Sequence, residues 1–287
     1  MSVDFPAELF RHWIGLSPGA FSVNDLSNDI ATRQVYIDMC EGFVDQGVLD
    51  RHGGRRGWYV PRQTDLVEMD YHNVEAYPLD IWLPFELSDL VELYENSVVV
   101  IAGAPNSGKT ALLLNIIREN MLKDWDVSYF NSEMSASELQ IRLKKFSHMG
   151  LHQWTFKAYE RSSRFADVIK PGPNQLNIID FLEVHDEFYK IGQWIKEIHD
   201  RLSGGIAVVA IQKNPNTDTG LGGFRTMEVT RLALALDFGK IKITKAKNFK
   251  QPDVNPNGLE RKFNLVDGCQ IITKRGWYKA TAMGEDA

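Results

Sequence analysis

The chain has 287 residues, enough for about two domains, one of them with a sizeable hydrophobic core. Hydrophobic residues make up 44% and charged residues 24%, proportions that exclude a disordered or collagen-like chain. No apolar run approaches the roughly 18 residues of a membrane helix, and the first residues do not form a signal peptide, so we expect a cytoplasmic protein without a membrane partner. The two cysteines, Cys40 and Cys269, indicate neither a disulfide framework nor a zinc site.

Charge is unevenly distributed along the chain. The net charge of −6 argues against a protein that coats nucleic acid by bulk electrostatics. However, residues 240–279 hold ten basic and three acidic residues, and residues 51–62 hold four arginines and no acid. Two local basic surfaces on an acidic body are typical of a protein that contacts a polyanion at chosen places, and solvated charged faces are the alternative.

Residues 1–62 are predicted to form a small α+β domain. Two helical patterns precede residues 48–60, where two β-prone runs flank a glycine-rich basic turn, the signal of a β-hairpin. This order of elements resembles a winged-helix domain, in which the hairpin contacts the DNA backbone. We therefore expect Arg55 and Arg56 to contact DNA. Acidic residues on the second helix leave a protein-binding role open.

The rest of the chain is predicted to be a linker and lead-in segment (63–95), a larger α/β domain (96–280) and a C-terminal tail (281–287). From residue 97 onward, β-prone runs alternate with amphipathic helical patterns. This alternation predicts βαβ units and a mainly parallel sheet. The predicted strands are residues 98–102, 127–131, 154–158, 176–181 and 206–211.

A phosphate-binding motif follows the first of these strands. It has the full pattern G-x-x-x-x-G-K-T and leads into a helical run. The glycines let backbone N–H groups approach phosphates, Lys109 neutralises β- and γ-oxygens, and the hydroxyl of Thr110 binds Mg²⁺. The residues assigned to nucleotide binding are Gly103, Ala104, Pro105, Asn106, Ser107, Gly108, Lys109, Thr110 and Ala111.

Magnesium-assisted phosphoryl transfer also needs a second metal ligand and a residue that orients water. Asp180 ends an apolar run, where a charge is costly unless it faces a metal at the carboxyl end of the strand. Glu133 follows another strand, and because Ser135 and Glu138 form a capping box after it, we assign Glu133 to catalysis. An acid near a helix N-terminus is the alternative for Glu133.

Gln212 follows the last predicted parallel strand and can donate to a γ-phosphate and accept from water. A polar, glycine-rich stretch, residues 213–225, comes directly after it and predicts a mobile loop that links nucleotide state to a partner. The alternative for Gln212 is a residue that simply ends a strand.

The segment after the second predicted strand is more specific than the phosphate motif. Residues 131–142 read N-S-E-M-S-A-S-E-L-Q-I-R, and over roughly residues 78–273 the sequence resembles the RecA-type P-loop ATPase core of DnaB-like replicative helicases. The family carries its catalytic glutamate in the E-M-S motif and an arginine nine residues later, which implies these roles for Glu133 and Arg142. The resemblance further implies an α/β fold, with a mainly parallel sheet sandwiched by helices, and ATP as the nucleotide.

Three later segments also carry the resemblance. The segment I-D-F-L around Asp180 is similar to the Walker B segment, and Gln212 matches the residue that senses the γ-phosphate and leads into the DNA-binding loop. This match implies that Lys213 and Arg225 are candidates for contacts with DNA phosphates. Residues 243–248 resemble the strand that reaches a neighbouring subunit's nucleotide. There, Lys245 matches the family's lysine, but Lys247 stands where the family has an arginine finger. Because lysine lacks the guanidinium fork, we expect weaker activation between subunits than in the family.

If Lys247 does not act between subunits, Arg225 and Arg231 are the substitutes. The family's primase-binding domain is replaced here by the winged-helix-like unit, a combination that suits a phage or mobile-element ATPase.

The sequence therefore predicts an ATP- and Mg²⁺-dependent DNA motor, a helicase or translocase, that acts in replication or recombination. Its expected partners are single-stranded DNA, copies of itself in a hexameric ring or a filament, and a replication or recombination protein. One alternative is a slow nucleotide-dependent switch or helicase loader that acts on a protein. A third interpretation is a transcription regulator in which the ATPase is a sensor.

Overall fold

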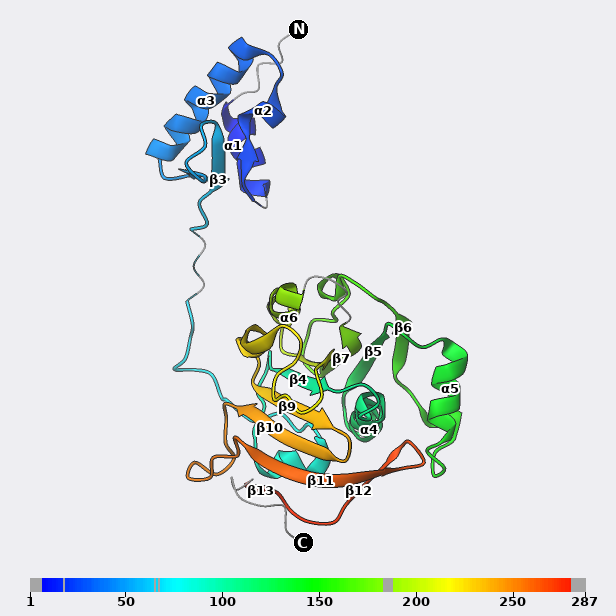
Figure 1. The fold of residues 1–287 in the computed structure, drawn as a ribbon. Coiled ribbons are helices and arrows are strands. Elements are labelled where there is room, and N and C mark those ends of the chain that lie inside the picture. Colours follow the sequence, from blue (N-terminus) through cyan, green and yellow to red (C-terminus); the bar gives the residue numbers. More distant parts are fainter. Residues whose placement is uncertain (1–6, 18, 65, 67, 183–187, 280–287) are drawn as a thin grey trace. The chain divides into compact units, whose positions relative to one another are not determined.

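The computed structural model describes residues 7–17, 19–64, 66, 68–182 and 188–279. The chain divides into two compact units, Met1–Val74 and Glu75–Ala287, and Figure 1 shows each of them. The start of the lead-in segment, from Glu75, thus belongs to the larger unit. The predicted tail, residues 281–287, lies outside the described residues.

The described residues of the smaller unit form three helices and an antiparallel sheet in the strand order β1-β3-β2, so the α+β prediction is confirmed. The Asp29 side chain caps the longest helix by accepting the backbone N–H of Thr32 at 2.8 Å. Aromatic residues dominate the core, in which Cys40 is fully buried, and burial raises the pKa of this thiol to about 12. The elements are α1 (Ala7–Leu16), β1 (Phe21–Ser22), α2 (Val23–Leu26), α3 (Ile30–Asp45), β2 (Leu49–Arg51) and β3 (Trp58–Pro61).

The larger unit is built on one mixed sheet, in the order β12-β11-β10-β9-β4-β8-β7-β5-β6, with β13 paired to β11. The strands from β9 to β6 are parallel, and the strands from β9 to β12 are antiparallel to one another. This confirms the mainly parallel sheet. The strands are β4 (Val98–Gly103), β5 (Asp126–Asn131), β6 (Lys157–Glu160), β7 (Gln175–Leu182), β8 (Ile206–Gln212), β9 (Leu232–Asp237), β10 (Lys240–Ala246), β11 (Leu259–Val266), β12 (Gln270–Thr273) and β13 (Tyr278–Lys279).

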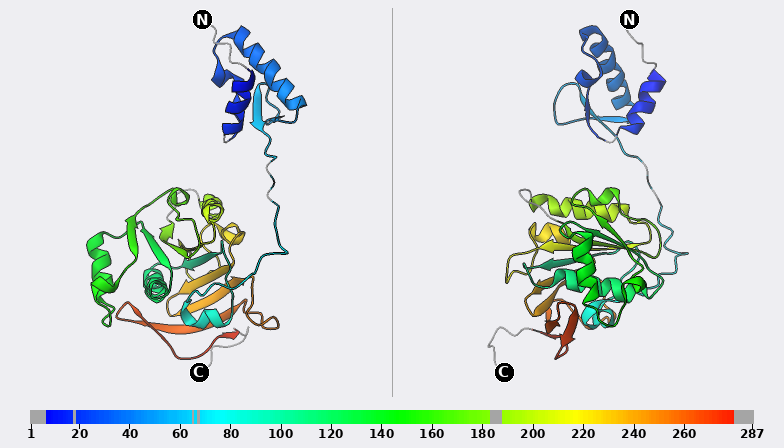
Figure 2. Two further views of the ribbon diagram at one scale, coloured as in Figure 1. Left: turned by 180° about the vertical axis from the view of Figure 1, so that it is seen from behind. Right: turned by 90° about the vertical axis from the view of Figure 1, so that its right-hand side faces the viewer.

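Helices cover both faces of this sheet (Figures 1 and 2). Alternate residues of β4 point to opposite faces, so that Ile101 belongs to one buried cluster and Val100 to the other. The first cluster includes α4 (Lys109–Met121) and the 3-10 helix η1 (Pro84–Asp89), and the second includes α6 (Ile191–Arg201). The other helices are α5 (Ala136–Lys144), η2 (Leu151–Gln153), η3 (Phe165–Asp167), η4 (Phe188–Lys190) and η5 (Gly223–Met227).

The strand predicted at residues 154–158 is wrong in position. Trp154 packs edge-to-face against Phe146 and Phe156, with ring centroids 5.2 and 5.8 Å away. The ladder with β5 begins only at Lys157, which pairs with Ser128. Trp154 and Phe156, although their type is common in strands, therefore pack with other rings instead of joining the sheet.

The C-terminal strands hold the lead-in segment against the core. The Arg261 guanidinium, 4% exposed, donates to the carbonyl of Phe85 at 2.6 Å and pairs with Glu86 at 2.9 Å. The Trp277 indole donates to the same carbonyl at 2.8 Å. We call this contact the clasp. Within the described ranges, no helix is long and apolar enough to cross a membrane.

Candidate nucleotide-binding site

The phosphate loop, residues 104–108, connects β4 to α4 at the carboxyl edge of the parallel strands. Gly108 has a φ of 95°, a left-handed value that only glycine adopts without cost, and a Cβ on Gly103 would lie 2.3 Å from Lys109 Cγ. The buried hydroxyl of Ser107 has no hydrogen-bond partner among the described residues. The loop thus presents backbone N–H groups, a helix N-terminus and an unsatisfied hydroxyl, which together fit a phosphate group.

Lys109 folds back onto this loop. Its ammonium donates to the carbonyls of Gly103 and Ala104, both at 3.1 Å, and lies 5.8 Å from the centre of the Phe181 ring. Burial lowers the pKa of Lys109, and the nearby carboxylate of Asp180 partly opposes this shift. An arriving phosphate would exchange two neutral carbonyl partners for a charged one, a stronger hydrogen bond for the ammonium.

Asp180 and Thr110 lie next to each other. Asp180 is 4% exposed, and its carboxylate accepts hydrogen bonds from the hydroxyls of Tyr129, at 2.7 Å, and Thr110. Burial raises the pKa of Asp180, although both hydroxyls and Lys109 oppose it. A carboxylate and a hydroxyl are hard oxygen ligands, and Mg²⁺ is commonly held by one carboxylate together with substrate phosphates. These residues therefore fit a magnesium ion brought in with a nucleotide.

A cavity of about 360 Å³ joins this pair to residues from three other elements. Glu133 is positioned by a local turn after β5, because Asn131 Oδ1 accepts the backbone N–H groups of Glu133 and Met134 at 3.2 and 3.0 Å. The capping box predicted at Ser135 and Glu138 is present. The residues predicted from the sequence that line the cavity are Pro105, Asn106, Gly108, Lys109, Thr110, Ala111, Glu133, Arg142, Asp180 and Gln212.

Sequence reasoning missed one wall of the cavity, which the β11–β12 hairpin forms. Leu265 and Gly268 line this wall, together with Lys145 at the end of α5. The hairpin is tied to the helix after the phosphate loop, since Asn115 Nδ2 donates to the Cys269 carbonyl at 2.8 Å. The dipeptide at 267–268, Asp-Gly, is a hairpin signal, but nothing local in the sequence shows what the hairpin would cover.

The loop after Gln212 is packed against the sheet rather than extended. Lys213 is 1% exposed, and its ammonium pairs with Asp237 at 2.5 Å. A Cβ on Gly220 would lie 2.2 Å from Ile211 Cδ1, so this part of the loop lies directly on β8. In this conformation the Lys213 ammonium does not face solvent, whereas Arg225 is exposed.

The basic residues of β10 lie outside this cavity. Lys245 donates to the Met227 carbonyl, and burial, together with the charges of Lys247 and Arg231, lowers the pKa of Lys245. Lys247 is exposed, and its backbone N–H donates to the Arg231 carbonyl at 3.1 Å. Neither Lys245 nor Lys247 lines the cavity.

Two of the four arginines of the N-terminal hairpin form ion pairs within the smaller unit. Arg51 pairs with Glu41, and Arg62 pairs with Asp50. Arg55 and Arg56 lie at the exposed turn, where the Arg55 guanidinium is 5.9 Å from the centre of the Trp58 ring. The net positive charge of this hairpin is therefore concentrated at its tip.

Comparison with known proteins shows what the larger unit is similar to. Residues 86–166 match the model of the DnaB-like helicase C terminal domain, a segment that holds the phosphate loop, Glu133 and Arg142 and ends before β7. A KaiC-like protein from the hyperthermophilic archaeon Pyrococcus horikoshii OT3 is similar in structure, with a TM-score of 0.50 and 14% identity over 70% of this chain and 100% of that one. This likeness shows the fold. The RadB recombinase gives a TM-score of 0.47 and 13% identity over 63% of this chain and 92% of that one. No curated protein matches the chain.

Proposed function

We propose that this chain, whose core is a RecA-type P-loop ATPase of the DnaB-like type, is a DNA-binding motor of the helicase or translocase kind that acts in replication or recombination. The observation that carries the proposal is the single cavity in which Lys109, Thr110, Asp180, Glu133 and Gln212 meet. Lys109 and Thr110 begin α4, Glu133 follows β5, Asp180 lies in β7 and Gln212 ends β8. Their side chains supply each part that Mg²⁺-assisted hydrolysis of a nucleoside triphosphate requires.

Each residue has a separate task in the proposed reaction. The phosphate loop and Lys109 bind the β- and γ-phosphates, and Thr110 and Asp180 would hold Mg²⁺, which neutralises charge on the transferred phosphoryl group. Glu133 takes a proton from the attacking water. Gln212 contacts the γ-phosphate and couples nucleotide state to the loop that follows. Its backbone carbonyl accepts a 2.8 Å hydrogen bond from the Leu221 N–H of that loop.

Activation between subunits is the proposed task of the β10 cations. Lys247 is exposed, beside Lys245 and Arg231, and lies outside the cavity of its own subunit. In the proposed arrangement this cation reaches the nucleotide of a neighbour, which requires a ring, such as a hexamer, or a filament. Arg225 is the proposed DNA contact of the core, and Arg55 and Arg56 are those of the smaller unit. Lys213 is not a DNA contact in this proposal, because it is buried against Asp237.

The test is ATP hydrolysis by the full chain with and without single-stranded DNA. We expect DNA to stimulate hydrolysis, and Glu133→Gln to lower the stimulated rate by about 10²- to 10⁴-fold while ATP binding persists. Lys247→Ala should also lose the stimulation, whereas Lys250→Ala, which removes an exposed lysine of the same segment, should keep it.

Mixing the two inactive variants tests the arrangement between subunits. A Lys247→Ala subunit has an intact Glu133, and a Glu133→Gln neighbour has an intact Lys247, so mixed oligomers should regain part of the lost rate. No recovery would count against Lys247 acting on a neighbour. A slow rate that DNA leaves unchanged would favour the alternative, a nucleotide-dependent switch or helicase loader, which the replacement of arginine by Lys247 also supports.

A further inference from the structure

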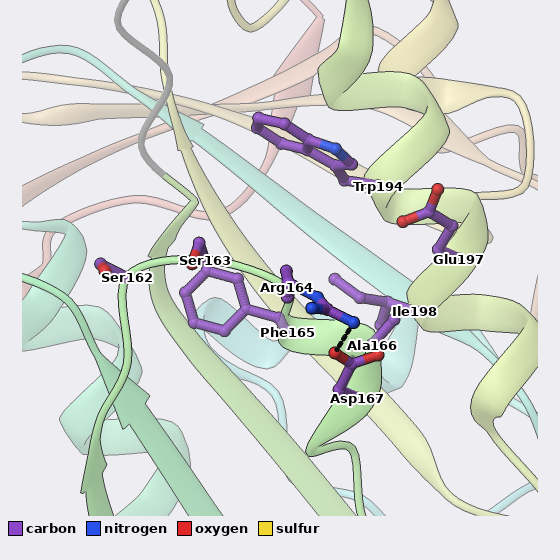
Figure 3. Close-up of a pocket in the computed structure, with 9 residues that line it drawn as sticks. All are labelled: Ser162, Ser163, Arg164, Phe165, Ala166, Asp167, Trp194, Glu197 and Ile198. Carbon is purple, nitrogen blue, oxygen red and sulfur yellow. Dashed lines mark ion pairs between the residues drawn. The ribbon is translucent and has the colours of Figure 1, made fainter.

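A second cavity, of about 290 Å³, lies in the larger unit, apart from the nucleotide site. Figure 3 shows its two sides: residues 162–167, which follow β6, and the face of α6 that carries Trp194, Glu197 and Ile198. Residues three and four apart share one face of a helix, so these three side chains line the cavity together. The ATP hydrolysis proposed above does not use this cavity.

The cavity has an apolar interior and a polar rim. Phe165, 3% exposed, and Ile198 are part of the buried cluster beneath it, and Trp194 packs at the edge of that cluster. Arg164 and Asp167 form an ion pair of 2.8 Å at the rim (Figure 3). Glu197 also lies at the rim, where it accepts a hydrogen bond from Gln193 at 2.8 Å. Ligand sites share this composition, a mostly apolar pocket with a few placed polar groups.

The volume limits what fits. Sites for drug-sized ligands begin at about 300 Å³, so this cavity accommodates one ring system rather than a whole nucleotide or a folded peptide. A phosphate is disfavoured inside because two carboxylates, Asp167 and Glu197, face it against one arginine. A flat, uncharged ring that offers hydrogen-bond donors at its edge matches both the tryptophan and the carboxylates.

Helix α6 connects this cavity to the proposed DNA contact. At Gly192, a Cβ would lie 2.8 Å from Arg225 Cβ, so Arg225 sits directly on the first turn of the helix. Residues two apart point to opposite flanks of a helix, so Arg225 and the cavity beside Trp194 lie on opposite flanks of α6. Phe224 beside it is 82% exposed, and Tyr189, just before the helix, is 60% exposed. Aromatic faces next to a cation are the composition with which proteins bind single strands.

We propose that the cavity takes one unpaired base of the bound strand, with Trp194 stacking on it, and that the strand crosses α6 so that Arg225 contacts a phosphate further along the backbone. The proposal rests on the DNA-binding function proposed above. Carboxylates accept hydrogen bonds from the exocyclic amino group of cytosine, and adenine and guanine carry such groups as well. Thymine lacks one, so the site prefers the other three bases to thymine.

The experiment measures the affinity of the full chain for labelled oligo-dC and oligo-dT of equal length, at several salt concentrations. We expect the wild type to bind oligo-dC more tightly than oligo-dT. Trp194→Ala should weaken oligo-dC binding about tenfold and remove the preference, while Trp194→Phe should retain most of the affinity. Trp154→Ala removes a tryptophan from another part of the core and is the matched control. It should bind both oligonucleotides as the wild type does.

The salt dependence separates base contacts from phosphate contacts. Trp194→Ala should leave the salt slope unchanged, whereas Arg225→Ala should reduce it by about one ion. Thermal unfolding of each variant checks its fold. If Trp194→Ala unfolds, Trp194→Phe and Glu197→Gln replace it in the test. Glu197→Gln should reduce the preference for oligo-dC.

Two other outcomes overturn the inference and differ from each other. If the wild type binds DNA but Trp194→Ala binds it equally well, the base site is wrong and the DNA-binding function stands; the cavity then serves another occupant, such as a protein side chain. If the wild type binds neither oligonucleotide, the proposed function falls together with the base site.

Discussion

Asp180 places a carboxylate in the interior of the sheet, where burial raises its pKa above the ordinary value of 3.8. A raised carboxyl pKa means that the folded chain binds a proton where the unfolded chain does not. The contribution of Asp180 to the free energy of unfolding therefore falls as the pH rises from about 4 through the folded pKa. Without Mg²⁺ and nucleotide, this residue costs stability at neutral pH.

Asp180→Asn should therefore stabilise the nucleotide-free protein at pH 7 by about 1 kcal/mol, and the difference should vanish toward pH 4. Chemical denaturation across this pH range measures it. Asp126→Asn, at the exposed start of β5, is the control and should show no such gain. Added Mg²⁺ and ATP should stabilise the wild type but not Asp180→Asn, and a variant less stable than the wild type at pH 7 would contradict this account.

Local patterns in the sequence identify the residues that line the cavity from the carboxyl ends of strands. Lys109 and Thr110 belong to a contiguous motif, and Asp180 stands out as a charge at the end of an apolar run. Lys213 shows the limit of such reasoning: its sequence neighbours indicate a polar loop, but its partner, Asp237, is 24 residues away. Only the parallel pairing of β9 and β8 with β4 brings the two together.

At the scale of elements, the loop between β8 and β9 depends on the backbone of its glycines. Gly222 has a φ of 104°, and a Cβ there would lie 2.8 Å from the Phe188 carbonyl oxygen. Gly223, its neighbour, has a φ of 63° and no atom within 4 Å of the Cβ position. The first position has both strain and a backbone clash, and the second has only the strain.

Gly222→Ala should thus lower the free energy of unfolding by about 2 kcal/mol or more, and Gly223→Ala by about 1 kcal/mol. Denaturant titration of both variants gives the comparison. We also expect Gly222→Ala to reduce the stimulation of ATP hydrolysis by DNA, because this loop follows Gln212. Equal losses of stability in the two variants would show that the loop does not lie against η4 in solution.

Elements differ in how well the sequence predicts them. Buried parallel strands such as β8 are continuous apolar runs, and their positions are correct to within a residue or two. The edge strand β6 is exposed along its length, so no hydrophobic pattern marks its start. The β11–β12 hairpin is a tertiary feature of the nucleotide site, since its sequence carries no sign that Leu265 contacts the phosphate loop.

At the scale of the whole molecule, the last residues of the smaller unit, after β3, carry apolar side chains in solvent. Leu66 is 96% exposed and Tyr71 is 77% exposed, within an acidic stretch that contains neither lysine nor arginine from residue 63 to residue 108. An exposed chain without regular secondary structure enters a protease active site readily. The helices and strands of both units should resist cleavage for longer.

Brief digestion with chymotrypsin should therefore cut first at Leu66 or Tyr71 and release two fragments, identified by mass spectrometry. Trypsin is the matched control, because this stretch offers it no site. If chymotrypsin leaves the stretch intact while it degrades either unit, a partner or a second copy of the chain covers these side chains in solution.

The clasp has a consequence for how the protein is made on the ribosome. Phe85 leaves the ribosome long before Arg261, which follows it by 176 residues, about ten to thirty seconds later at ordinary rates of synthesis. Until then, the lead-in segment lacks its ion pair, and the nucleotide site lacks the wall that contains Leu265. The nascent chain therefore passes through a period in which the phosphate loop is already synthesised but its cavity is still open on one side, so completion of the ATP site is tied to completion of the C-terminal strands.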